Sequence, residues 1–459
     1  MVQKNKMLQG PMIPAMGRFL VPVALGFILQ QLYAMADAII LGNLVGKSAL
    51  AAVGGSAFSL INVIYIFFGG FSSGGCIAIS QAFGLGDSKR CKAGIETAMT
   101  LSVIMGAVIT VLGIGFAPDL LKLLKTPDEI LKMSEDYLGC YMLGMIPALV
   151  YNMGNAILRS MGESRKPLRY LVIGTAVNVG LDYILIAFFN AGVKGAAIAS
   201  AASQTLSAFL VVRALAKDHK GLWFRFNLDD IRQIMRLGLP SGLQNAMYTV
   251  SGLFIQGAIN TLGTDSVAAW SAFSKLDSFF WSISAGFNVT MLTFSAQNYG
   301  AGKLQRIRKG ARLLLLLDLG VSSLFSLTFC LLRTSCIRLF SQDPEVIRIG
   351  SQVIVYISAF YCLFAFTEIL SAAIRGTGNT LGPSIVTFLS VCVLRLLLIY
   401  GLAMQSPSNI RIALCYPISW LASSAAFIIF YKAKVRTLVP TPGTRTPLRS
   451  QQPLSPPRE

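Results

Sequence analysis

The sequence predicts an all-α integral membrane protein with twelve transmembrane helices in two six-helix lobes, related by a pseudo-two-fold axis along the membrane normal. Hydrophobic residues make up 54% of its 459 residues and charged residues only 13%, a balance outside the range of soluble globular domains. Twelve apolar stretches are long enough to cross a hydrocarbon core of about 30 Å. Short motifs recur halfway along the chain, which indicates an internal repeat.

The twelve spans divide the chain into five parts. We place the spans near 15–42, 50–82, 93–117, 133–158, 167–190, 194–216, 233–261, 266–297, 307–332, 346–374, 381–403 and 409–434. The segments between them hold turn-forming glycine, proline and aspartate, which end helices. The predicted parts are a cytoplasmic N-terminus at 1–14, a first lobe at 15–216, a basic cytoplasmic linker at 217–232, a second lobe at 233–436 and a proline- and arginine-rich tail at 437–459.

Three pairs of landmarks relate the two halves at a nearly constant offset. The pairs are Gln81-x-x-Gly84-x-Gly86 with Gln297-x-x-Gly300-x-Gly302, Arg159-x-x-Gly162 with Arg375-x-x-Gly378, and Pro22 with Pro240. The first two pairs lie 216 residues apart and the third 218. Because each half holds an even number of spans, both halves enter the membrane from the same side, so the axis runs along the membrane normal. We interpret the Gly-x-Gly motifs as helix stops rather than phosphate loops.

The formal charge of +19 is concentrated in short clusters between the apolar stretches. Of the 39 lysines and arginines, 28 fall on one side of the predicted membrane. We therefore expect a multi-pass protein of the plasma membrane with both termini in the cytoplasm, as the positive-inside rule indicates. The same rule explains the basic charge without a nucleic-acid partner. We expect the basic tail to be disordered, with binding to anionic lipid headgroups as the alternative.

The residue types that carry most enzyme chemistry are sparse or scattered. Eight cysteines form no Cys-x-x-Cys pair, and the single histidine, His219, lies in the predicted linker. No arrangement of serine, histidine and aspartate suggests a hydrolase, and no spacing suggests a metal site. We therefore predict that the protein is not an enzyme and uses no cofactor.

Carboxylate and amide side chains inside the first lobe are the strongest candidates for function. Asp37 lies within the first apolar stretch, where an ionised carboxylate without a partner would cost several kcal/mol. Asn178 and Asp182 are four residues apart on one face of the fifth span, and Asn155 ends the fourth span. We predict that these four side chains converge on one site. The alternative is that Asn178 and Asp182 only hydrogen-bond between helices.

The second lobe lacks these acids at the matching positions, where Ile255 and Leu398 stand. Its own intramembrane charges form a possible second site for ion or substrate: Lys275, Asp277, Glu368 and Arg395. The alternative is that Glu368 pairs with Arg395, and that Lys275 pairs with a carboxylate on another span.

Together these motifs resemble the multidrug and toxic compound extrusion (MATE) transporters over roughly residues 10–436. The similarity rests on Asp37-x-x-x-x-Gly42, the Gln-x-x-Gly-x-Gly and Arg-x-x-Gly motifs and Asn178-x-x-x-Asp182, in this order. The resemblance implies two lobes that form a V around a central cavity. Within the family, the sequence is most similar to a prokaryotic branch whose coupling aspartate lies in the first lobe. Its ion-coupling and substrate-binding residues match Asp37, Asn155, Asn178 and Asp182, with Ser200 for a sixth-span hydroxyl and Pro22 for a bending proline. Other branches have a seventh-span glutamate, where this chain offers Gln244, Asn245 and Gln256.

The resemblance implies an antiporter that exports amphipathic, often cationic, drugs or toxic compounds by alternating access, in exchange for protons or sodium. Sodium, if it is the coupling ion, is expected at Asp37, Asn178 and Asp182. We expect Pro22 to let the first span bend as Asp37 changes charge. The expected partners are small-molecule substrates and the lipid bilayer, for a monomeric protein. The nearest alternative is a lipid-linked saccharide flippase of the same broad superfamily, whose pyrophosphate cargo favours a cavity ringed by cations.

Overall fold

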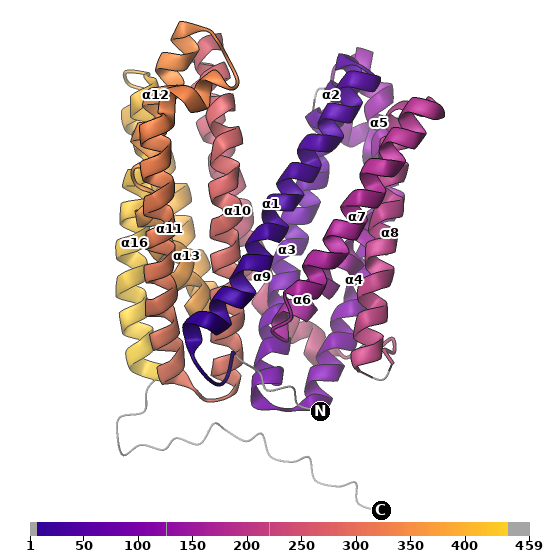
Figure 1. Cartoon of the computed structure of the whole chain (residues 1–459), viewed down its shortest axis with the longest axis vertical. Helices are drawn as coiled ribbons and strands as arrows, with labels where there is room; N and C mark the ends of the chain where they lie inside the picture. The colour runs from indigo at the N-terminus through magenta and orange to yellow at the C-terminus, as the bar shows by residue number, and fades with distance from the viewer. Residues whose placement is uncertain (1–6, 125, 220, 439–459) are drawn as a thin grey trace, which may run out of the picture.

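The computed structural model describes residues 7–124, 126–219 and 221–438. Most of the predicted tail therefore lies outside the described residues. Within the described ranges every regular element is helical. The helices form two bundles that meet at the end carrying both chain termini, called the termini side, and diverge toward the opposite end, called the far side (Figure 1).

The first bundle comprises eight helices. They are α1 (Met12–Leu44), α2 (Lys47–Ala52), α3 (Phe58–Leu85), α4 (Ser88–Leu123), α5 (Asp128–Leu143), α6 (Met145–Ser160), α7 (Arg165–Tyr183) and α8 (Gly192–Asp218). Two π-helical stretches, η1 (Val53–Ala57) and η2 (Ile184–Phe188), join α2 to α3 and extend α7. Counted as continuous segments, these helices coincide with the first six predicted spans.

The second bundle repeats this order. Its helices are α9 (Leu228–Asn260), α10 (Thr264–Gly300), α11 (Leu304–Arg338), α12 (Pro344–Ser358), α13 (Tyr361–Gly376), α14 (Leu381–Thr387), α15 (Leu394–Leu398) and α16 (Asn409–Leu438). The π-helical stretches η3 (Phe388–Val393) and η4 (Ile399–Ala403) flank α15. Helical structure also covers both ends of the predicted linker, because α8 runs to Asp218 and Asn227 caps the start of α9.

Among the described residues, eight helical segments are long and apolar enough to cross a membrane, and two bent pairs raise the number to ten. The pairs are α5 with α6, bent by 53°, and α12 with α13, bent by 45°, at corresponding places in the two bundles. The helices α9 and α10 have the length of a span but carry polar side chains such as Gln244, Asp277 and Asn288. These side chains line a cavity between the bundles, which explains why the two helices are less apolar.

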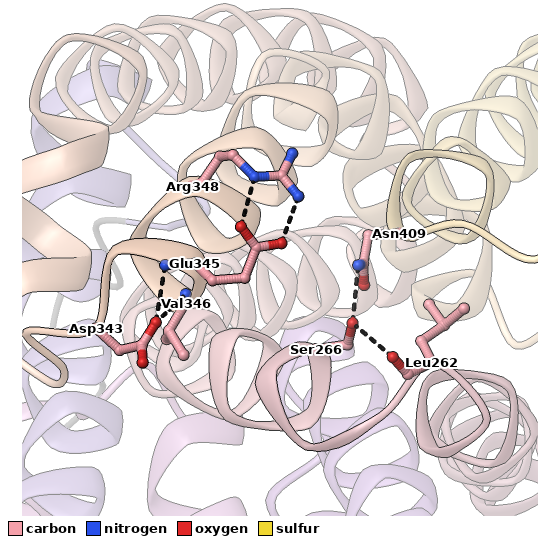
Figure 2. Close-up of polar contacts among 7 residues, drawn as sticks. All are labelled: Leu262, Ser266, Asp343, Glu345, Val346, Arg348 and Asn409. Atoms are coloured by element: carbon pink, nitrogen blue, oxygen red, sulfur yellow. Dashed lines mark hydrogen bonds and ion pairs between the residues drawn. The ribbon is translucent and has the colours of Figure 1, made fainter.

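Polar side chains form hydrogen bonds at helix ends on the far side of the second bundle. Asp343 accepts hydrogen bonds from the backbone amides of Glu345 and Val346 and so caps α12 (Figure 2). The same view shows Asn409, near the start of α16, donating to Ser266 near the start of α10. These bonds satisfy backbone and side-chain groups at helix ends, where intrahelical partners are lacking.

The Gly-x-Gly motifs do end helices, as the sequence predicts. Gly86 follows α3 with a φ of 81°, and Gly302 follows α10 with a φ of 70°. Glycine adopts this left-handed conformation without steric penalty.

The two bundles touch where α3 crosses α9, through glycines. A β-carbon on Gly70 would overlap the backbone of Gly242, and one on Gly74 would overlap the backbone of Ile234 and Gly238. The missing side chains let the helices approach closely, as small residues do in membrane helix pairs. This crossing closes the termini half of the space between the bundles.

Gly74→Ala is expected to lower the free energy of unfolding by about 1–3 kcal/mol, because the added methyl group overlaps α9. The matched control is Gly320→Ala on α11, where a β-carbon meets nothing within 4 Å. Since alanine favours helix over glycine by roughly 1 kcal/mol, the control should be neutral or stabilising. Thermal unfolding of the purified variants in detergent measures both effects, and equal unfolding temperatures would contradict the tight crossing.

Candidate functional site

Two carboxyl groups meet inside the first bundle, where α1 packs against α7. Asp37 of α1 and Asp182 of α7 lie within hydrogen-bonding range of one another. The side chain of Asp182 is fully buried. Both of its oxygens and Oδ1 of Asp37 are buried without a hydrogen-bond donor from the described part of the chain. The site is therefore short of positive charge.

This arrangement cannot keep both carboxylates ionised at low cost. Two like charges at this distance repel one another, and burial removes the water that would screen them. A hydrogen bond between the two groups also needs a proton on one of them, because two carboxylates offer acceptors alone. Either a proton or a metal cation with a preference for oxygen ligands would relieve the repulsion.

Neutral polar groups surround the acid pair. The hydroxyl of Tyr33 lies 3.3 Å from Ser200 Oγ, and Asn178 Nδ2 donates to the same oxygen at 3.4 Å. Asn178 Oδ1 is buried without a partner, and so it is a further free oxygen beside the carboxyl groups. The structure thus places Asp37, Asn178, Asp182 and Ser200 near one another. Tyr33 was not predicted, although its position four residues before Asp37 puts it on the same helical face.

Asn155 does not join this group. It lines a small separate cavity that also involves Pro22, Gly26, Tyr151 and Pro167, and its Oδ1 has no hydrogen-bond partner there. The predicted convergence of four side chains is therefore wrong for this residue. The α1 residues that line this cavity run from Pro22 to Gln30, so Asn155 faces the part of α1 that precedes Asp37.

A cavity of about 680 Å³ lies between the two bundles. Its charged lining residues are Arg159 from the first bundle and Asp277, Glu368, Arg375 and Arg395 from the second. Apolar and aromatic side chains make up much of the remaining wall. Its lining, as described, does not include Asp37 or Asp182. The acid pair and the central cavity are thus separate places.

The two cavity acids each have donors within the second bundle. Asp277 accepts a hydrogen bond from the hydroxyl of Tyr361 at 2.5 Å and from Trp281 Nε1 at 2.6 Å. Glu368 accepts from Asn288 Nδ2 at 2.6 Å. The same amide accepts from Arg375 Nη2 at 2.7 Å, so that Asn288 bridges the acid and the arginine.

The ion pairs considered for this bundle are not formed in the described structure. Arg395 bonds to serine hydroxyls rather than to Glu368. Lys275 is exposed, and no carboxylate of the described chain lies within ion-pair distance of it. Of the predicted second-lobe residues, Asp277, Glu368 and Arg395 line the cavity and Lys275 does not.

Two arginines counted as loop charges in the sequence belong to the cavity instead. Arg159 and Arg375 lie near the ends of α6 and α13, and both line the cavity. Arg375 is only 6% exposed. Their recurrence in matching Arg-x-x-Gly motifs was the signal that could have indicated a shared position in the two bundles.

Two glutamines cross-connect the bundles on the termini side. Gln81 Nε2 donates to the carbonyl of Gly376 at 2.9 Å, and Gln297 Nε2 donates to the carbonyl of Ser160 at 2.6 Å. A β-carbon on Gly84 would overlap the backbone of Gln297, and one on Gly300 would overlap that of Gln81. The repeated motif thus has a second role besides ending helices. We call these reciprocal contacts the glutamine latch.

Comparison with known proteins finds similar sequences and a matching family model. The family model described as MatE matches residues 22–184 and 240–400. The "Probable multidrug resistance protein YoeA" of Bacillus subtilis (strain 168) is 25% identical over 390 residues, which cover 82% of this chain and 84% of the relative.

Solved structures share the fold. An "Outward-facing conformation of a multidrug resistance MATE family transporter of the MOP superfamily" has a TM-score of 0.89 at 20% identity, covering 95% of this chain and 99% of that one. A MOP superfamily transporter from Pyrococcus furiosus, whose description reads "Reverse polarity of binding pocket suggests different function", has a TM-score of 0.89 at 21% identity, covering 96% and 100%. The likeness confirms the predicted architecture of twelve helices in two lobes.

Asp182→Asn is expected to raise the free energy of unfolding by about 1–4 kcal/mol in sodium-free buffer at alkaline pH, because it removes one of two facing buried charges. The difference from the wild type should shrink as the pH falls, since the wild-type pair then takes up a proton. Asp119→Asn, at an exposed position on α4, is the matched control. Thermal unfolding across the pH range measures the effect. Destabilisation of Asp182→Asn at every pH would contradict the repulsion.

Proposed function

The chain belongs to the MatE family, whose model matches both of its halves, and from this premise we propose that it is a cation-coupled antiporter. In this proposal it exports amphipathic small molecules across the plasma membrane by alternating access, with both termini in the cytoplasm and one chain as the working unit. The family is one of multidrug efflux transporters and is not an enzyme class. The observation that carries the coupling proposal is the facing pair of Asp37 and Asp182.

The acid pair is proposed as the coupling site. A proton or a sodium ion binds between the carboxyl groups, with Asn178 Oδ1 and the hydroxyl groups of Tyr33 and Ser200 as further oxygens nearby. Binding relieves the repulsion between the two charges, and release restores it. A membrane potential adds roughly 2.3 kcal/mol per elementary charge per 100 mV to drive the ion inward.

Helix α1 is proposed as the element that links ion binding to movement. It carries Asp37, it packs against α7 within its own bundle, and it packs against α10 of the other bundle. A β-carbon on Gly286 of α10 would crowd Ala24 of α1, so the two backbones lie close there. Pro22, two residues before Ala24, removes one helical hydrogen bond and so provides a place for α1 to bend.

The glutamine latch is proposed as the gate on the cytoplasmic side. Both of its hydrogen bonds run between bundles, and both must break if the bundles separate at the termini side. Each bond is neutral and contributes about 1 kcal/mol. A gate of this strength opens readily when α1 changes its position.

The central cavity is proposed as the binding site for cargo. Its volume of about 680 Å³ lies within the range of sites for drug-sized ligands. The flippase alternative is not favoured, because the family model and the relatives that match are of the MATE type. The cavity lining combines arginines with acids, so the proposal here is amphipathic cargo without restriction to cations.

Asp37→Asn and Asp182→Asn are each expected to abolish uptake of dye that is driven by an ion gradient into inside-out vesicles, because neither variant can bind and release the coupling cation. Carboxyfluorescein and tetramethylrhodamine methyl ester serve as anionic and cationic dyes, under separately imposed proton and sodium gradients. The gradient that drives wild-type uptake identifies the ion.

The control for this experiment is Asp119→Asn, which changes an exposed aspartate of the same bundle and should transport like the wild type. Undiminished uptake in both acid variants would refute the coupling site. If wild-type vesicles accumulate neither dye under either gradient, the antiport proposal fails.

The double variant Gln81→Leu with Gln297→Leu is expected to open the termini side more often, by roughly thirtyfold if both bonds contribute about 1 kcal/mol. Cys76 is buried and lines the central cavity. A membrane-impermeant maleimide added to inside-out vesicles should therefore modify Cys76 faster in the double variant, as quantified by mass spectrometry of its peptide.

The exposed Gln256→Leu on α9 is the matched control and should leave the rate of Cys76 modification unchanged. A double variant that reacts at the wild-type rate would show that the latch does not hold the gate closed.

A further inference from the structure

One charged side chain in the second-bundle wall of the cavity, Arg395, has no acidic partner in the described chain. Arg395 lies on α15, between the π-helical stretches η3 and η4, and its side chain is only 4% exposed. It lines the central cavity within a membrane-spanning segment. An arginine in this environment is costly and marks a functional site by default. Interruptions of this kind in an α-helix are also frequent at functional sites.

Neutral groups hold the Arg395 guanidinium in place. Its Nε and Nη2 donate to Ser419 Oγ at 3.1 and 2.8 Å, and its Nη1 contacts Ser251 Oγ at 3.4 Å. Both serine hydroxyls donate their own protons to backbone carbonyls, of Tyr416 and Val391. The serine oxygens are therefore fixed as acceptors. A guanidinium has five N–H groups, so these three bonds leave donors available to a ligand.

The other second-bundle charges of the cavity have hydrogen-bond partners within that bundle, although Arg375 keeps a buried Nε without one. Asp277 has Tyr361 and Trp281 as donors. Glu368 and Arg375 share Asn288 between them. No carboxylate of the described chain lies within ion-pair distance of Arg395. The charge left for a ligand to neutralise in the second-lobe part of the cavity is therefore positive.

Aromatic rings continue from this arginine along the cavity wall. The guanidinium carbon lies 4.6 Å from the centre of the Tyr416 ring. The ring centre of Trp420 is 5.7 Å from that of Tyr416 and 6.2 Å from that of Trp281, and Trp281 in turn lies 4.7 Å from Phe364. All four rings line the cavity. Tyr416 and Trp281 are partly exposed and offer apolar ring surface on which another aromatic ring can stack, whereas Trp420 and Phe364 are buried behind them at 1% exposure each.

We propose that the second-lobe part of the central cavity binds an aromatic organic anion, with its carboxylate, sulfonate or phosphate on Arg395 and its ring against Tyr416 and Trp281. The inference rests on the proposed function, in that the bound anion is the exported cargo. Each of these acid groups presents two oxygens that accept parallel N–H bonds from the planar guanidinium, which gives direction as well as charge neutralisation.

The experiment measures dye binding to the purified full-length protein in nanodiscs by fluorescence anisotropy. Carboxyfluorescein and tetramethylrhodamine methyl ester share a xanthene ring system and differ in charge, so the comparison isolates the effect of charge. The wild type should bind the anionic dye at least about tenfold more tightly than the cationic dye. Arg395→Gln should weaken binding of the anionic dye by about tenfold or more and leave that of the cationic dye equal or stronger. Arg395→Lys, which keeps the charge without the planar fork, should lose less affinity.

The matched control is Arg411→Gln, an exposed arginine near the start of α16 that lies outside the cavity lining. It should bind both dyes like the wild type. Tighter binding of the cationic dye by the wild type, or unchanged binding of the anionic dye by Arg395→Gln, would overturn the inference. The wild-type comparison stands even if Arg395→Gln does not fold.

Failure of this inference can be told apart from failure of the antiport proposal, because equilibrium binding needs no ion gradient. Transport of the cationic dye alone, driven by a gradient and matched by cation-selective binding, overturns the anion site and leaves the antiporter standing. Selective binding of the anion by a protein that transports neither dye supports the site and refutes the antiporter.

Discussion

Two carboxyl groups that face each other inside the membrane constrain the rest of this structure. Asp37 and Asp182 repel one another when both are ionised, and the described chain supplies no cation beside them. A proton or a cation bound between the two groups would relieve this repulsion. Helix α1 contacts both α7 and α10, so in the proposed cycle a change at Asp37 would pass along α1 to the other bundle.

The two bundles have the same order of helices but carry different polar and charged side chains. Their glutamine latch is reciprocal, with each bundle reaching a carbonyl of the other. The acid pair has no counterpart, since Ile255 and Leu398 occupy the matching positions. The second bundle instead holds the aromatic wall and Arg395. In the proposed function, the repeated residues would form the gate, whereas ion coupling and cargo binding would depend on residues that differ between the halves.

The charge that the cavity presents to a ligand depends on which of its charged side chains are paired, more than on the number of acids and bases that line it. Glu368 and Arg375 are connected through Asn288, and Asp277 is held by two donors of its own bundle. Arg395 has only hydroxyl oxygens and a ring face. A count of acids and bases suggests a nearly balanced site, yet in the second bundle the hydrogen bonds leave the positive charge of Arg395 without an acid. A buried charge attracts a ligand mainly through the hydrogen-bonding groups that the protein leaves unpaired, because an unpaired polar group is costly when it is buried.

The sequence by itself determined the twelve spans and the repeat, and it predicted one site for Asp37 and Asp182, because hydrocarbon demands long apolar segments and makes a buried acid exceptional. Asn178 and Ser200 were also predicted at that site, whereas the tertiary structure excluded Asn155 and added Tyr33. Packing likewise turned Arg159 and Arg375 inward and aligned the two latch glutamines. Composition and periodicity state which residues a helix carries, but the tilt and rotation of each helix depend on its neighbours. Which polar groups meet is therefore decided by packing between segments far apart in the chain.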